Sequence, residues 1–244
     1  MEYIFQDKES LHPDNNSLEN IIYRKIKEEI RTLVIKPGEK MSEMKIAKKM
    51  DCSRSPVRGA FRQLQHQGFL EIRPQIGTFV PFIDLVSAEK TRFIRESLET
   101  SVLKLGIKTS AYDNQIEYLQ DLINRQNELY KNKRYVEFEH LDQLFHSFFC
   151  NTVNKPFIKE YLGSADVHYS RLQSISLRYD PYPIVTIEQH QEILNSVKAK
   201  NISQMEKAVS THLQNLYRVV RLCKNNVQPL IANIELLDSL IESL

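Results

Sequence analysis

Glycine and cysteine are scarce in this sequence of 244 residues, which contains 6 glycines and 3 cysteines. So few glycines disfavour turn-rich all-β folds and the glycine-rich loops that bind nucleotide phosphates. The cysteines, Cys52, Cys150 and Cys223, are odd in number and lack CxxC spacing, so we expect reduced thiols. The sequence also lacks a run of 18 apolar residues and a signal-peptide pattern, and we therefore expect a cytoplasmic protein without a membrane span.

Charge is distributed unevenly along the chain, although the formal net charge is only +2. Residues 18–82 contain 13 Lys and Arg against 7 Asp and Glu, whereas residues 83–244 contain 19 against 20. The first 17 residues are acidic, and 41% hydrophobic residues are enough for a folded core. The basic segment favours a polyanion as its partner, although a solvated basic face would have the same composition.

Three amphipathic helices are predicted in the basic segment, over 17–33, 42–50 and 53–68, each beginning at a serine that can cap it. Two short β-like runs, 69–73 and 78–80, follow them and predict a hairpin. Three helices and a hairpin make a winged helix-turn-helix, whose third helix enters the DNA major groove by its N-terminal end.

The third predicted helix presents a polar, basic face near its start. Arg54 and Arg58 are four residues apart and share that face, where a guanidinium can bind guanine or clamp a phosphate. Ser53 and Ser55 can donate to phosphates at the helix N-terminus, and Arg62 continues the stripe. An exposed basic helix without a DNA partner would show the same pattern.

Residues 35–80 resemble the DNA-binding domain of GntR-type bacterial regulators. The resemblance is carried by Pro37-Gly38, Met41-Ser42-Glu43, Ile46-Ala47, Ser53-Arg54-Ser55-Pro56-Val57-Arg58, Leu64, Gly68-Phe69 and Gly77-Thr78-Phe79-Val80. It implies base or phosphate contacts from the two arginines and a minor-groove approach by the wing tip near Gly77. One departure is Gly59, where the family usually has Glu. The predicted DNA-contacting residues are Ser42, Ser53, Arg54, Ser55, Arg58, Arg62 and Gly77.

The rest of the chain is predicted to be helical, so we expect a mainly α protein. The predicted helices span 87–110, 112–132, 134–152, 156–177, 185–200 and 202–226, with Pro156, Pro181 and Pro183 at boundaries. We divide the chain into an N-terminal tail (1–16), a winged helix-turn-helix domain (17–82), an all-helical domain (83–228) and a C-terminal amphipathic helix (229–244).

Four metal-ligating side chains fall on or beside the apolar faces of the helical domain. Asp142 and His146 are one turn apart on the third of these helices, and His190 and His212 lie on the fifth and sixth. Buried Asp and His are costly without partners, and a divalent cation would satisfy all four, although separately satisfied core residues are the alternative. Oxygen and imidazole ligands leave Zn, Ni, Mn and Fe open.

Residues 87–226 resemble the FCD effector domain that often follows this type of DNA-binding domain. The resemblance is carried by Asp142-Gln143-Leu144-Phe145-His146, Glu188-Gln189-His190-Gln191-Glu192-Ile193-Leu194, Thr211-His212-Leu213 and the pair Arg95 and Glu99. One residue separates Glu188 from His190, where the family has Glu and His adjacent. The resemblance implies a metal, held by Asp142, His146, His190 and His212, at the floor of a cavity for a small organic acid.

The resemblance also suggests which residues bind the acid. Arg95 would pair with its carboxylate, with a surface ion pair as the alternative, and His168 and Arg171 are further candidates. We do not expect the remaining histidines, which are His12, His66 and His140, to be ligands.

The sequence therefore predicts a dimeric transcription regulator, more specifically a repressor and not an enzyme. Its partners would be a near-palindromic double-stranded operator and a small carboxylate effector. Three alternatives stay open: a regulator that responds to the metal itself, an interaction protein with a structural metal, and a metal-dependent hydrolase. The hydrolase lacks an HExxH motif and a separate base.

Overall fold

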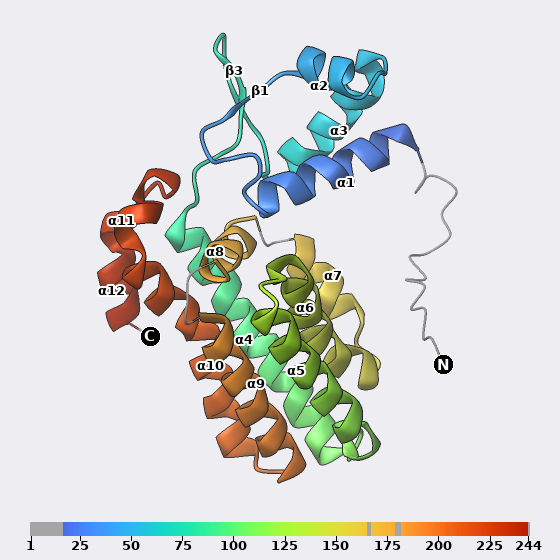
Figure 1. Ribbon diagram of the computed structural model, residues 1–244, viewed down its shortest axis with the longest axis vertical. Helices are drawn as coiled ribbons and strands as arrows, with labels where there is room; N and C mark the ends of the chain where they lie inside the picture. The colour runs from blue at the N-terminus through green and yellow to red at the C-terminus, as the bar shows by residue number, and fades with distance from the viewer. Residues whose placement is uncertain (1–16, 165–166, 179–181, 244) are drawn as a thin grey trace. The chain divides into compact units, whose positions relative to one another are not determined.

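The computed structural model describes residues 17–164, 167–178 and 182–243 (Figure 1). The predicted N-terminal tail, with His12, and Pro181 lie outside these residues. The chain divides into two compact units, Met1–Pro81 and Phe82–Leu244, and each is described by itself.

The first unit is a winged helix-turn-helix. Its helices are α1 (Leu18–Arg31), α2 (Glu43–Lys49) and α3 (Arg54–His66), and its strands are β1 (Lys40–Met41), β2 (Glu71–Arg73) and β3 (Gly77–Phe79). The sheet is antiparallel in the order β1-β3-β2. The predicted hairpin is therefore confirmed as β2 and β3, and β1 is an additional strand that the sequence pattern did not reveal.

Local hydrogen bonds explain where these helices begin and end. Ser17 and Ser42 occupy the N-caps of α1 and α2, and their hydroxyls accept from backbone amides of the first turn. Ser53 occupies the N-cap of α3, but its side chain makes no capping bond, so this part of the prediction is wrong. Gly68 follows α3 with a φ of 78°, a left-handed conformation that suits glycine and ends the helix.

The first unit is held together by the packing of α1 against α3. The i, i+4 spacing of isoleucines places one row of α1 inside, and α3 contributes a matching row. The buried residues are Ile22, Ile26 and Ile30 from α1 and Val57, Phe61 and Leu64 from α3. This packing leaves the opposite face of α3, with its arginines, exposed.

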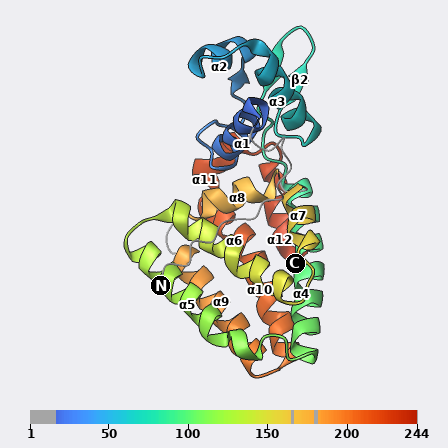
Figure 2. The same ribbon diagram turned by 90° about the vertical axis from the view of Figure 1, so that its right-hand side faces the viewer.

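The second unit is a bundle of helices (Figures 1 and 2). Its longer helices are α4 (Leu85–Lys108), α5 (Ile116–Lys131), α6 (Tyr135–Thr152), α7 (Phe157–Ser164), α8 (Tyr169–Ser176), α9 (Tyr182–Lys198) and α10 (Ile202–Leu222). Short elements complete it: η2 (Asp113–Gln115), α11 (Lys224–Val227), η3 (Gln228–Leu230), η4 (Ile234–Leu236) and α12 (Leu237–Glu242). The apolar core lies mainly between α4, α5, α6, α9 and α10.

Three predicted helices differ from those observed, and one of them, 202–226, is divided at Cys223 into α10 and α11. The span 156–177 forms two helices, α7 and α8, and its sequence includes the weak helix formers Gly163 and Ser164 where α7 ends. The span 229–244 contains short turns and α12 instead of one helix. Ile231 forms a parallel bridge with Ile83. The carbonyl of Leu230 and the amide of Ala232 bond to the backbone of Ile83, so they are not available for the hydrogen bonds of a continuous helix.

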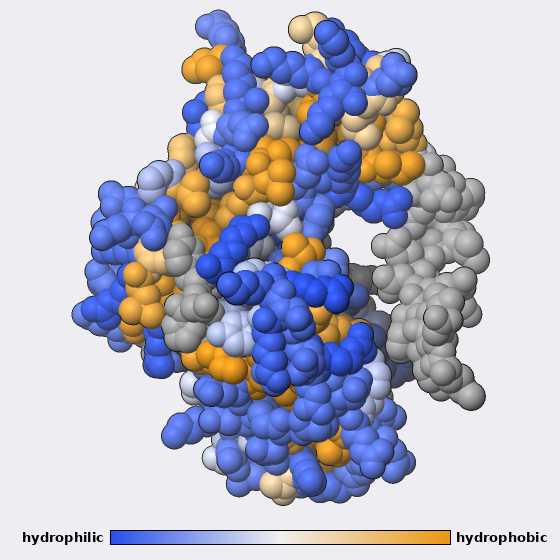
Figure 3. Space-filling view, viewed as in Figure 1, coloured by the Kyte–Doolittle hydropathy of each residue, from blue (hydrophilic) through white to orange (hydrophobic). Residues whose placement is uncertain are grey.

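Among the described residues, no helix is both long and apolar enough to cross a membrane. On the face drawn in Figure 3, hydrophilic side chains cover most of the helical unit, with hydrophobic ones in separate patches.

Candidate metal centre and nucleic-acid interface

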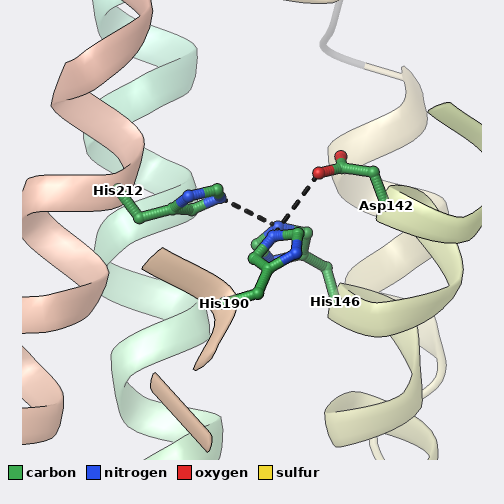
Figure 4. Close-up of side chains that lie close together, drawn as sticks. All are labelled: Asp142, His146, His190 and His212. Carbon is green, nitrogen blue, oxygen red and sulfur yellow. Dashed lines mark hydrogen bonds and ion pairs between the residues drawn. The ribbon is translucent and has the colours of Figure 1, made fainter. Parts of the chain in front are cut away.

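Four side chains from three helices meet inside the second unit. Asp142 and His146 come from α6, His190 from α9 and His212 from α10 (Figure 4). One ligand atom of each lies within 4.8 Å of those of the others. The structure thus brings together all four residues that the sequence predicted as metal ligands.

Three of the four side chains, those of Asp142, His190 and His212, are buried, and burial changes their acidity. Phe145 is fully buried and stacks on the ring of His190, with 4.2 Å between ring centroids. Burial raises the pKa of Asp142 and, together with neighbouring imidazoles, lowers the pKa values of His190 and His212. Two of the three rings are therefore neutral, the form in which imidazole binds a metal.

Glu99 on α4 fixes the orientation of His146. Its Oε2 lies 2.8 Å from Nδ1 of His146, and its Oε1 accepts from Nε of Arg95 at 2.9 Å. Burial alone would raise the pKa of Glu99, but the charges and hydrogen bonds of His146 and Arg95 hold it well below its usual range. An ionised carboxylate only accepts, so Nδ1 of His146 carries a proton and Nε2 faces the centre of the group.

Three glutamines form hydrogen bonds with the outer atoms of the other three ligand residues. Gln126 Oε1 lies 2.9 Å from Nδ1 of His190, and Gln189 Oε1 lies 3.3 Å from Nδ1 of His212. Gln173 donates from Nε2 to Oδ2 of Asp142 at 2.7 Å. Each ligand is bonded through its outer atom, so three Nε2 atoms and Oδ1 of Asp142 remain for a common partner.

The inner atoms fit a bound cation. Nε2 of His146 lies 3.1 Å from Nε2 of His212, a contact between two lone pairs unless a proton or a metal ion lies between them. Glu99 raises the pKa of His146, which favours a proton at this position when no ion is bound. Nε2 of His190 is buried without a hydrogen-bond partner, at 3.4 Å from Oδ1 of Asp142. One proton between two rings would leave the third ring unsatisfied, whereas a divalent ion would satisfy all four atoms.

A small cavity adjoins the ligand group. It is lined by Glu99, His146, Phe149 and Cys150 among others, and its volume is about 10 Å³. That volume holds about one water molecule, so a larger ligand requires the surrounding helices to move.

The predicted effector-binding residues lie in different surroundings. Arg95 is bonded to Glu99 and stacks on Tyr169 at 4.8 Å, with a side chain that is only 11% exposed, so it does not form a surface ion pair. His168 accepts from the backbone amide of Asp84 and from Arg171, and Arg171 also donates to the carbonyl of Val167. Burial lowers the pKa of Arg171 to about 10, and burial beside Arg171 lowers that of His168 to about 4.

The sequence interpretation assigned no role to Glu99 or to the three glutamines. Gln126 could have been found, because it follows Leu119, Leu122 and Ile123 on the buried face of α5 and is itself fully buried. A glutamine in an otherwise apolar stripe needs a polar partner inside the protein. Of the three histidines that we do not expect to be ligands, His66 and His140 lie in the described residues, and both are exposed.

The basic face of α3 is open in the first unit. Arg54 and Arg58 have side chains that are 60% and 58% exposed, and both lie near one carboxylate oxygen of Glu43, at 3.2 and 3.5 Å. Ser53, Ser55 and Arg62 are exposed as well. Ser42 caps α2, and Gly77 opens β3 with a φ of 137°. Two exposed arginines therefore share one carboxylate on this face of α3.

Gly59, the departure from the family pattern, lies against the side chain of Glu19 on α1. A side chain at this position would collide with the carboxylate of Glu19, which itself accepts a hydrogen bond from Gln63 at 2.7 Å. A glutamate at position 59 would add a second carboxylate close to that of Glu19, so the Glu19 side chain would have to move away.

Comparisons with known proteins agree with both halves of this description. The family model "Bacterial regulatory proteins, gntR family" matches residues 18–80, and the model "FCD domain" matches residues 91–215. The chain is 26% identical over 200 residues to the Escherichia coli HTH-type transcriptional repressor RspR, covering 82% of this chain and 87% of RspR. It is also 26% identical to the Uxu operon regulator of Haemophilus influenzae, covering 82% and 83%.

A solved structure shares the fold. The structure titled "E. coli McbR/YncC" superposes with a TM-score of 0.69 at 20% identity, covering 84% of this chain and 98% of that one.

Proposed function

The chain belongs to the GntR family of bacterial regulatory proteins and has an FCD domain, and from this premise we propose a repressor controlled by a small carboxylate bound at a metal. Transcriptional regulation, not enzymatic catalysis, is the activity of the family and of the relatives. We infer repression, not activation, from the Escherichia coli relative RspR, which is a transcriptional repressor.

The observation that carries the proposal is the set of four inward-facing ligand atoms with outer atoms bonded to Glu99, Gln126, Gln173 and Gln189. Asp142, His146, His190 and His212 would hold the ion, which we leave open among Zn, Ni, Mn and Fe. Bound there, the ion supplies a Lewis-acidic position for a carboxylate oxygen. Arg95 is the nearby cation that would receive the second oxygen, with His168 and Arg171 as further candidates.

The first unit would bind the operator through the exposed face of α3. Arg54 and Arg58 exchange Glu43 for guanine edges or phosphates, Ser53 and Ser55 donate to phosphates, and the wing tip at Gly77 approaches the minor groove. Ser42 and Arg62 flank this surface. A homodimer in the bacterial cytoplasm would place two such units on a near-palindromic site.

The metal centre is tested by elemental analysis of purified protein. We expect His190→Ala to lose most of its bound metal, because it removes a fully buried ligand. His140→Ala, at an exposed histidine of α6, is the matched control and should keep the metal content of the wild type. Far-UV circular dichroism establishes that both variants fold. Equal metal content in a folded His190→Ala protein would exclude this site.

The operator surface is tested by fluorescence anisotropy with a duplex selected from random-sequence DNA. We expect Arg58→Ala to lose about 1–3 kcal/mol of binding free energy. Arg125→Ala on α5 removes an arginine of similar exposure, 56% against 58%, and should bind like the wild type. Unchanged affinity for Arg58→Ala would contradict the proposed interface.

A second candidate, in which the ion itself is the signal, is favoured by the small size of the cavity beside the ligands. Operator affinity measured with and without Zn²⁺, and then with a panel of small carboxylates on the zinc-loaded protein, separates the two. A response to zinc alone supports the metal-responsive regulator, and a response to a carboxylate supports the proposal.

A further inference from the structure

The segment 83–85 is held by parts of the chain that are distant in sequence. It follows the first unit, which ends at Pro81, and precedes the body of α4. Its three consecutive amides donate from Ile83 to the carbonyl of Leu230, from Asp84 to Nδ1 of His168 and from Leu85 to Oδ1 of Asn233, each at 2.9 Å. Two of these bonds go to the C-terminal segment, and the middle one goes to His168, the N-cap residue of α8.

Helix α8 is bonded at its other end to the metal-ligand face of α6. Gln173 donates to Oδ2 of Asp142 at 2.7 Å, and Ser174 donates to Oε1 of Glu139 at 3.2 Å. Asp142 and Glu139 are three residues apart on α6 and are both buried. One short helix therefore contacts the ligand group and the segment that leads from the DNA-binding unit.

We propose that α8 couples the metal site to the segment 83–85, with Gln173 and His168 as its two contact residues. This inference rests on the proposed function. Gln173 bonds the outer oxygen of Asp142, so a metal that fixes the inner oxygen also fixes Gln173. The two contact residues are five positions apart, about 7.5 Å along a helix axis. Every residue of α8 is buried, so the helix transmits a displacement instead of absorbing it.

Within the segment 83–85, Asp84 is the residue that a movement of His168 would affect first, because its amide donates to the imidazole. Arg171 reaches Nδ1 of His168 at 3.2 Å and also donates to the carbonyl of Val167, which braces the imidazole. Asp84 is the N-cap of α4 and accepts from the amide of Ser87 at 2.6 Å. A shift of His168 thus acts on the first turn of α4, while the C-terminal segment holds the residues on either side of Asp84.

The test is hydrogen–deuterium exchange of the full-length protein with and without saturating Zn²⁺, read in peptides that contain residues 83–85. In the wild type, zinc should slow this exchange about fivefold, equivalent to about 1 kcal/mol. At Zn²⁺ concentrations that saturate each variant, Gln173→Leu and His168→Leu should both lose the zinc-dependent slowing. The zinc affinity of Gln173→Leu should fall, because the variant removes a hydrogen-bond partner of the ligand Asp142. His168→Asn should retain it, because Oδ1 of Asn can accept from the Asp84 amide. Gln143→Leu, at an exposed glutamine of α6, is the matched control.

Zinc binding is measured separately by calorimetry, so that two failures can be distinguished. If the wild type binds zinc and the exchange of 83–85 does not change, the coupling is refuted while the metal site stands. If the wild type binds no zinc, the proposed function fails and the coupling with it. Zinc-dependent slowing in Gln173→Leu, or its loss in His168→Asn, would also overturn the inference, since either shows that these contacts do not transmit the signal.

Discussion

Glu99→Gln is the substitution that most directly tests how the ligand group is organised. Glu99 accepts from Nδ1 of His146 at 2.8 Å and from Arg95 at 2.9 Å inside the protein, so it both selects the tautomer of His146 and balances a nearby cation. A neutral amide nearly preserves the shape but removes the charge. Carboxylate partners of metal-binding histidines are worth about 10–100-fold in metal affinity. We expect a loss in that range, which corresponds to about 1.4–2.7 kcal/mol.

The assay is a zinc competition titration against a chromophoric chelator at neutral pH. Glu96→Gln is the matched control, because Glu96 lies on the same helix but pairs with Arg92. We expect the control to bind zinc like the wild type. If a folded Glu99→Gln protein holds zinc within about twofold of the wild type, the carboxylate does not set the ligand geometry, and the tautomer argument is refuted.

Two further predictions concern pH and DNA discrimination. The pKa of His168 is about 4 in the folded protein, against 6.5 in the unfolded chain. Burial and the charge of Arg171 disfavour the protonated imidazole, and the charge of Asp84 offsets them only in part. Its contribution to the free energy of unfolding is present above pH 6.5 and is lost as the pH falls towards 4, by at most about 3 kcal/mol. Denaturant titrations should show a shallower loss over this range for His168→Asn, and parallel curves would contradict it. Glu43→Gln removes the carboxylate that pairs with both Arg54 and Arg58. The affinity for random-sequence duplex DNA should rise about threefold, because the substitution removes the repulsion between one negative charge and a phosphate about 7 Å away in water. Anisotropy titrations against selected and random DNA should show a reduced affinity ratio, and unchanged random binding would refute this role.

The sequence placed Asp142 and His146 on one face of a helix, because positions four apart in an α-helix always share a face. It placed His190 and His212 inside for the same reason, since each lies within the apolar arc of its own helix. Sequence also revealed the winged unit, because serine caps, Gly68 and the alternation of the hairpin are local signals. These features depend on residues within one or two turns of each other.

Tertiary packing decided which atoms of those side chains face one another. The partners that orient the ligands lie far away in the chain: Glu99 is 47 residues from His146, Gln126 is 64 from His190 and Gln173 is 31 from Asp142. No local periodicity relates such pairs. The same holds for the C-terminal segment, where an amphipathic pattern predicted a helix but the bridge from Ile231 to Ile83 used its backbone groups instead. Sequence thus determined which side chains are turned inward, and the tertiary structure determined which atoms meet there, because hydrogen-bond partners are chosen only when separate helices pack together.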